Sequence, residues 1–102
     1  MSQPEYSVRL LRIAEDDLTE IVAYIAADRP SAGEQLATRI EKNLHLLARN
    51  PQLGRIPDEE ELLRVGYRYL VVENYLIFYT IEAKTILVHR TLHGARDYLN
   101  LL

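Results

Sequence analysis

The sequence predicts an α+β fold in which an antiparallel helical hairpin packs on a small antiparallel sheet. Residues 14–49 contain two stretches whose apolar side chains recur every three or four positions, the period of an amphipathic helix. Residues 67–92 contain three runs rich in Val, Ile, Leu, Thr and Tyr, and the short gaps between these runs can join only adjacent antiparallel strands. We therefore expect the order β-α-α-β-β-β, with a short helical turn at the C-terminus, in a single domain over residues 1–102.

The N-terminal part predicts one strand and one helix. Residues 6–13, YSVRLLRI, alternate imperfectly between polar and apolar side chains and are interpreted as a short first strand. A helix is expected over residues 14–28, because Leu18, Ile21 and Ile25 fall on one helical face. Its first turn is acidic, which the helix dipole favours, and Arg29-Pro30 ends it.

A second helix is expected to run to residue 49, where Asn50-Pro51 ends it. Its start is open between two signals. Ser31 and Glu34 have the spacing of a capping box, and Pro30 at the first helical position with Asp28 as the cap is an equally good start. The link to the first helix is so short that the two helices must form an antiparallel hairpin. The buried stripe of the second helix is formed by Leu36, Ile40, Leu44 and Leu47.

The C-terminal half predicts the sheet. Strands are expected at residues 67–72, 75–81 and 85–92, and the helical hairpin supplies their cover. The connection at residues 53–61 ends in an acidic run, interpreted as a solvated turn or the start of a short helical turn. Residues 95–102 could form a final helical turn, whose leucines would be exposed unless something covers them.

Composition excludes several classes of function. The net charge is −3, and it is uneven: residues 1–61 carry 7 Lys/Arg and 12 Asp/Glu, whereas residues 62–102 carry 5 and 3. A generic nucleic-acid binder would show a basic excess. The chain has no cysteine, no secretory signal and no apolar run of the roughly 20 residues that a membrane span needs. We expect a cytoplasmic protein that requires no cofactor and does not contact a membrane.

Two histidines are candidates for chemistry. His89 and His93 lie four residues apart in a predicted strand, on what we expect to be the same side of the sheet. Four strand residues span roughly 13 Å, too far for one ion to bridge, so no metal site is predicted.

A polar cluster follows the last predicted strand. His93 could act there as a general acid or base, with Arg68, Arg90 or Arg96 steadying a phosphate. In the alternative interpretation, His93 caps the strand, and Arg96 pairs with Asp97 or with a carboxylate of the helical hairpin. From the residues alone, this structural interpretation is favoured.

The chain as a whole resembles the RelE/ParE superfamily of bacterial toxins from type II toxin–antitoxin pairs. The resemblance covers nearly the full length and rests on the order and spacing of five motifs. These are A-x-x-D-L-x-x-I-x-x-Y-I-A from Ala14, L-L-A-R-N-P-Q-L-G-R from Leu46, G-Y-R-Y-L from Gly66, N-Y-L-I-F-Y from Asn74 and L-H-G-A-R-D from Leu92.

The resemblance implies a helical hairpin on a small antiparallel sheet and a growth-arresting toxin. It also implies a cognate antitoxin that lays a partly disordered segment across the toxin in a hetero-oligomeric complex. The leucines of the C-terminal tail and the flank of the helical hairpin are the expected docking surfaces.

The superfamily has two functional classes. RelE-like and YoeB-like members are ribosome-dependent endoribonucleases that cut mRNA, and ParE-like members inhibit DNA gyrase. The acidic chain favours the ParE-like class, as does the absence of an arginine from residues 75–79, where the YoeB-like pattern has one.

Each class implies its own site residues. The gyrase-inhibiting class has no catalytic site, and we expect its target-binding residues to be His93, Arg96, Tyr98, Leu99, Leu101 and Leu102. The endoribonuclease alternative would use His93, Arg68, Arg90 and Arg96, with Glu61 or Glu73 as base. His93 falls where the YoeB-like pattern has its catalytic histidine, although Gly94 follows it instead of tyrosine.

Overall fold

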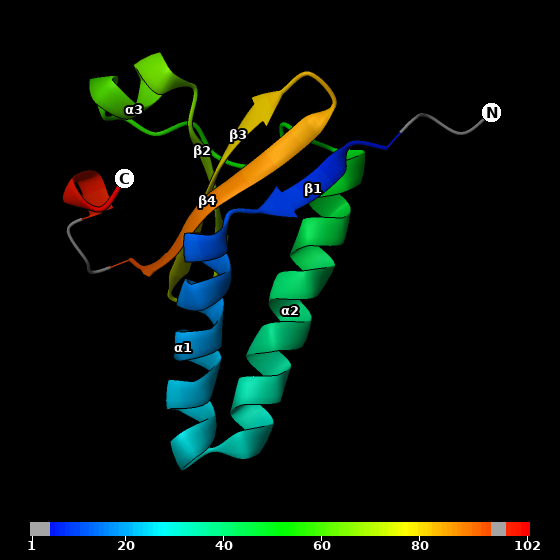
Figure 1. Cartoon of the computed structure of the whole chain (residues 1–102), viewed down its shortest axis with the longest axis vertical. Helices are drawn as coiled ribbons and strands as arrows, with labels where there is room; N and C mark the ends of the chain where they lie inside the picture. The colour runs from blue at the N-terminus through cyan, green and yellow to red at the C-terminus, as the bar shows by residue number, and fades with distance from the viewer. Residues whose placement is uncertain (1–4, 95–97) are drawn as a thin grey trace.

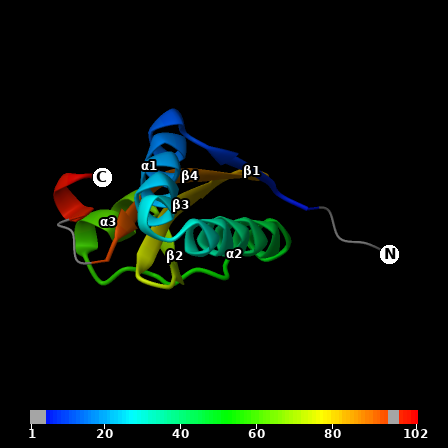
Figure 2. The same ribbon diagram turned by 90° about the horizontal axis from the view of Figure 1, so that it is seen from below.

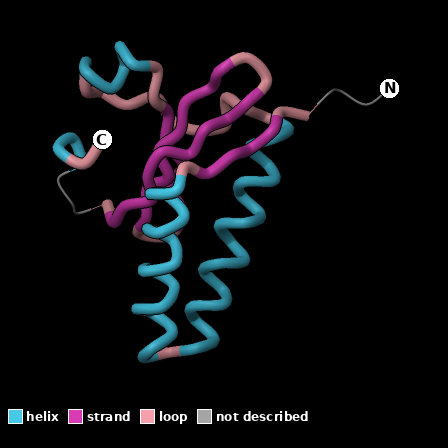
Figure 3. The backbone as a smooth tube through the Cα atoms, in the orientation of Figure 1, coloured by secondary structure: helices cyan, strands magenta, loops and turns pink. Residues whose placement is uncertain are grey.

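Two long helices lie against one face of a four-stranded sheet (Figures 1 and 3). The structure, a computed structural model, describes residues 5–94 and 98–102. Its elements are β1 (Ser7–Leu10), α1 (Arg12–Asp28), α2 (Pro30–Arg49), α3 (Glu60–Val65), β2 (Arg68–Val72), β3 (Tyr75–Glu82), β4 (Thr85–His93) and a 3-10 turn, η1 (Tyr98–Asn100). The predicted β-α-α-β-β-β order and the C-terminal turn are confirmed.

Several ends of the elements differ from the sequence prediction, whereas the acidic run agrees with one of its two interpretations. The first strand ends at Leu10 and α1 begins at Arg12, so part of the predicted strand is helical. The second helix begins at Pro30, with Arg29 as its N-cap and no side-chain capping bond. Capping by Ser31 or Asp28 was therefore wrong, and the proline start was right. The acidic run leads into α3, whose first turn carries two glutamates, as the dipole of that helix favours.

The sheet is mixed because of its first strand. The strand order is β1-β4-β3-β2, and β2, β3 and β4 form the predicted antiparallel meander. β1 pairs with β4 in parallel, Ser7 opposite Thr85 and Leu10 opposite Val88. The short gaps of the meander dictate antiparallel pairing. β1 and β4 are far apart in the sequence and are not joined by a short gap, so the direction of β1 relative to β4 could not be predicted.

Each face of the sheet has its own apolar core. The helical face packs under α1 and α2, and its buried residues are Ala14, Leu36, Ile40, Leu47, Leu70, Val72, Ile77, Tyr79, Ile86 and Val88. The outer face is covered by α3 and by the C-terminal residues, and its buried residues are Leu62, Tyr67, Phe78 and Leu92. Figure 2, viewed from below, shows the two helices in front of the strands.

A β-bulge at His89 changes which side chains of β4 meet each face. Val88 lies opposite Tyr79 and Arg90 lies opposite Phe78, so His89 is an extra residue in β4. Beyond it the alternation of β4 is inverted: Val88 belongs to the helical core and Leu92 to the outer core. The prediction that His89 and His93 share a side of the sheet was therefore wrong, because a side-chain period of two holds only without an insertion.

The helical hairpin extends beyond the sheet (Figure 1). Its helices approach closely at Gly33, where a Cβ atom would lie 2.9 Å from the Cβ of Ala26. Tyr24, near the free end of the hairpin, is 83% exposed. Over residues 5–94 and 98–102, no helix is both long and apolar enough to cross a lipid bilayer.

Candidate functional site

The C-terminal turn, residues 98–102, lies on the outer face with most of its apolar side chains turned inward. The ring of Tyr98 lies 5.1 Å from that of Phe78, and Leu101 and Leu102 pack against the same core. Leu99 is the apolar residue of this turn that points outward, with 41% exposure. The sheet thus accounts for most of the leucines that looked uncovered in the sequence.

Two hydrogen bonds between distant segments hold the C-terminal turn. The Tyr98 hydroxyl donates to the carboxylate of Glu59, just before α3, at 2.6 Å. This bond raises the pKa of Tyr98 to about 12 and lowers the pKa of Glu59. Arg90 Nη1 donates to the backbone carbonyl of Leu101 at 3.0 Å.

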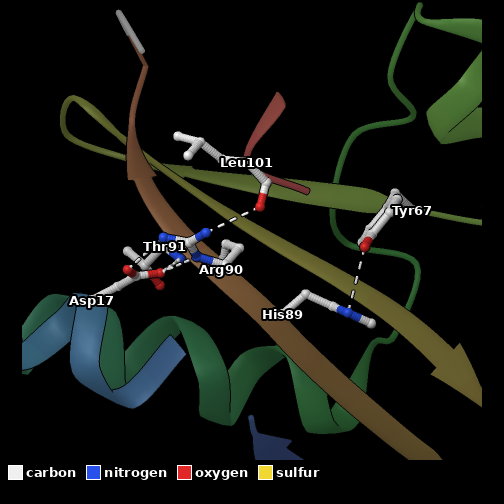
Figure 4. Close-up of polar contacts among 6 residues, drawn as sticks. All are labelled: Asp17, Tyr67, His89, Arg90, Thr91 and Leu101. Carbon is white, nitrogen blue, oxygen red and sulfur yellow. Dashed lines mark hydrogen bonds and ion pairs between the residues drawn. The ribbon is translucent and has the colours of Figure 1, made fainter. Parts of the chain in front are cut away.

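Arg90 also forms a part-buried ion pair with Asp17 of α1 (Figure 4). Its Nε and Nη2 atoms donate to the two carboxylate oxygens of Asp17 at 2.7 and 2.9 Å, and this bond raises the pKa of Arg90. The two side chains are only 15% and 12% exposed. The same carboxylate accepts the backbone N–H of Thr91 at 3.1 Å. The pairing of β4 with β1 ends at Val88, and Asp17 accepts the N–H group of Thr91 beyond that point.

His89 lies between two hydroxyl groups on the outer face. Its Nε2 is 2.8 Å from Thr80 Oγ1, and its Nδ1 is 3.4 Å from the Tyr67 hydroxyl, a contact drawn in Figure 4. Burial lowers the pKa of His89. A hollow of about 220 Å³ adjoins it, lined by Leu11, Ile13, Tyr67, His89, Arg90, Leu101 and Leu102.

The lowered pKa of His89 predicts that the protein loses stability in mild acid. The unfolded chain takes up the proton near the ordinary value of 6.5, whereas the folded protein resists it. The free energy of unfolding should therefore fall as the pH drops through 6.5 towards the lower pKa of the folded state. Urea denaturation at about pH 7.5 and about pH 5.5 measures this loss, which His89→Gln should reduce. His45→Gln, at an exposed position, should leave it unchanged. An equal loss in wild type and His89→Gln would contradict the prediction.

Of the residues expected for an endoribonuclease, the three that can be compared in the described part of the chain, His93, Arg90 and Arg68, do not converge. His93 lies opposite Tyr75 on the helical face, with their rings 5.5 Å apart, whereas Arg90 lies opposite Phe78 on the outer face. Arg68 donates to the Gly54 carbonyl at 3.1 Å. It lies opposite Tyr79, four residues along β3 from Tyr75, which is roughly 13 Å.

The remaining site predictions can be placed only in part. Arg96, expected in both classes of site, lies outside the described residues, as does its expected partner Asp97. Within the described part of the chain, no group of three or more His, Cys, Asp or Glu residues could hold a metal ion.

The sequence interpretation missed the ion pair, although a signal for it was present. Asp17 follows Ala14 by three residues and precedes Leu18, so it lies on the stripe of α1 that faces the sheet. A carboxylate in that position requires a cation or hydrogen-bond donors. Asp17 is a carboxylate of the helical hairpin, and the arginine with which it pairs is Arg90 of β4.

Comparison with known proteins gives the family. The profile described as "ParE toxin of type II toxin-antitoxin system, parDE" matches residues 8–98. No curated protein matches the sequence significantly.

Two solved structures are similar in fold. One, from the chromosomal ParDE system of P. aeruginosa, is 20% identical in sequence and has a TM-score of 0.72. The match covers 89% of this chain and 98% of the solved chain. The other, from the toxin–antitoxin complex RelBE2 of Mycobacterium tuberculosis, is 22% identical with a TM-score of 0.63 and covers 93% and 98%. Because the family profile spans nearly the whole chain, this protein belongs to the ParE toxins of type II toxin–antitoxin systems.

Proposed function

We propose that this toxin arrests growth by binding and inhibiting DNA gyrase, and that a cognate antitoxin neutralises it in a hetero-oligomeric complex. The supporting observation is the pairing of Arg90 with Asp17. A phosphate-binding arginine presents its fork of N–H donors to the substrate, whereas this one presents two of them to a carboxylate that also offsets its charge. Inhibition of a protein target requires a binding interface. It does not require free guanidinium N–H groups that bind a phosphate.

The C-terminal turn is the proposed gyrase-binding surface. Leu99 supplies an outward apolar side chain on it. Tyr98, Leu101 and Leu102 lie beside Leu99, and His93 precedes the segment at the end of β4. Apolar and aromatic anchors of this kind carry most of the energy of protein–protein interfaces.

The helical hairpin and its flank are the proposed antitoxin-binding surface. A groove of about 330 Å³ runs between β1 and α2, with apolar walls formed by Val8, Leu10, Leu44 and Ala48. Tyr24 adds an exposed ring near the free end of the hairpin. The two similar solved structures are named as toxin–antitoxin systems, which supports a partner of this kind.

A supercoiling assay with purified gyrase and relaxed plasmid tests the target. The wild-type chain should inhibit supercoiling, and Leu99→Ala should raise the half-inhibitory concentration roughly tenfold or more, because a central apolar anchor is lost. Leu46→Ala is the matched control, since Leu46 is 55% exposed on α2 and lies away from the C-terminal turn. Adding the product of a neighbouring antitoxin gene should restore supercoiling.

The endoribonuclease alternative has its own readout. Absence of gyrase inhibition, together with codon-specific cuts in mRNA on a programmed ribosome, would replace the proposal. Loss of those cuts in His93→Ala would then assign the catalytic role to that histidine.

A further inference from the structure

We infer that Arg90 is a positioning residue that couples helix α1 to the C-terminal turn, so that a partner bound to α1 controls how firmly this turn is closed. The effect of this coupling on gyrase binding rests on the proposed function, whereas the coupling itself is a property of this chain alone. One guanidinium group hydrogen-bonds two separate parts of the chain, Asp17 on α1 and Leu101 in the turn (Figure 4).

The geometry makes the second bond depend on the first. The guanidinium is a rigid plane with five N–H donors, and a bidentate carboxylate fixes the direction of that plane. Asp17 holds Nε and Nη2, which leaves Nη1 directed at the Leu101 carbonyl. Without Asp17, the side chain of Arg90 can rotate about its flexible stem and lose this acceptor.

The closed turn partly covers three of the residues that we propose contact gyrase. Tyr98, Leu101 and Leu102 are turned towards the outer core, where Phe78 and Leu92 are 1% and 2% exposed. A target that contacts the buried parts of all three side chains must therefore lift the turn from the sheet. Polar contacts that oppose this step are the Arg90 bond and the Glu59 bond to Tyr98.

The coupling provides a route for regulation without direct contact. A partner on α1 that tightens the contact of Asp17 with Arg90 keeps the turn closed. By thermodynamic linkage, a target that opens the turn weakens binding of that partner by the same factor. An antitoxin on the helical hairpin would thus oppose gyrase binding at the other side of the sheet.

Amide hydrogen exchange of the full-length chain tests the coupling directly. The N–H groups of Leu101 and Leu102 both bond to the Tyr98 carbonyl, so their exchange reports opening of the turn. Asp17→Asn should speed their exchange at least about tenfold, because an amide cannot hold the guanidinium as a bidentate carboxylate does. Arg90→Lys should do the same, and Asp17→Glu should restore much of the protection.

Two comparisons separate this effect from a general loss of stability. Asp16→Asn is the matched control, because Asp16 is 64% exposed and pairs with the exposed Arg12, at 3.9 Å. It should leave exchange unchanged. Amides of the β3–β4 ladder should accelerate less than those of the turn. Equal acceleration in the ladder, or unchanged exchange of Leu101 and Leu102 in Asp17→Asn, would overturn the inference.

The gyrase assay tests whether the turn must open for gyrase to bind. It uses Glu59, a residue outside the proposed gyrase-binding surface. Glu59→Gln removes the charged acceptor of Tyr98 and should favour the open turn. We expect a lower half-inhibitory concentration than for the wild type. An unchanged or higher value would overturn the requirement for opening. A wild-type chain that leaves gyrase active, but whose turn still responds to Asp17→Asn, would refute the proposed target and leave the coupling intact.

Discussion

Replacing Asp17 with alanine is expected to lower the free energy of unfolding by about 3 kcal/mol, the lower end of the cost of breaking a buried ion pair from one side, because this pair is part-buried. The change leaves the guanidinium of Arg90 without its counter-charge at 15% exposure. It also removes the acceptor of the Thr91 N–H group. Denaturant unfolding of the purified chain at neutral pH measures this loss.

The adjacent position supplies the control for this prediction. Asp16→Ala breaks an ion pair at 3.9 Å between side chains that are 64% and 90% exposed. Exposed pairs contribute about 0–1 kcal/mol, so this variant should remain close to the wild type. Similar losses at the two positions would show that the part-buried pair has no special role in stability.

The second large effect is expected at Gly54. A Cβ atom there would lie 2.5 Å from the hydroxyl oxygen of Tyr79 and 2.6 Å from its ring. Tyr79 is fully buried, so it has no solvent into which to move. Gly54→Ala should therefore lower the free energy of unfolding by about 2–3 kcal/mol through overpacking.

Tyr79→Phe tests the same contact from the other side. The Tyr79 hydroxyl donates to the Pro51 carbonyl at 2.8 Å and accepts the Gly54 N–H at 2.9 Å. Tyr79→Phe removes this hydroxyl and leaves the Pro51 carbonyl and the Gly54 N–H without their partner. We expect the free energy of unfolding to fall by about 1–3 kcal/mol for each of these two groups. Gly94→Ala is the control, because its Cβ would meet no atom closer than 3.4 Å. If Gly54→Ala unfolded at the same denaturant concentration as the wild type, the overpacking prediction would be contradicted, because the Tyr79 side chain would have moved to make room for the added methyl group.

Local periodicity was sufficient to predict most of the fold. The stripe of Leu36, Ile40 and Leu47 is buried as its spacing predicted, and the short gaps between strands produced the antiparallel meander. The parallel pairing of β1 and the bulge at His89 could not be predicted. Both depend on contacts between segments that are distant in the sequence, and neither leaves a local pattern.

The candidate site was less predictable for the same reason. Arg90 was one of three arginines considered for a phosphate in the endoribonuclease alternative, and its actual partner Asp17 lies 73 residues away in the sequence. Asp17, Pro51, Gly54 and Tyr79 all occur in the motifs that carry the resemblance to the superfamily, yet in this structure they form hydrogen bonds within the fold. Such motifs therefore predict an architecture more securely than they predict a target.

The extra residue in β4 shifts the alternation of that strand by one position. Side chains before His89 contribute to the core under the long helices, whereas Leu92 contributes to the opposite core. Deleting His89 would exchange the environments of all later side chains in the strand at once. The insertion therefore determines which of the later β4 side chains meet the helical scaffold and which meet the exterior layer beside the C-terminal turn.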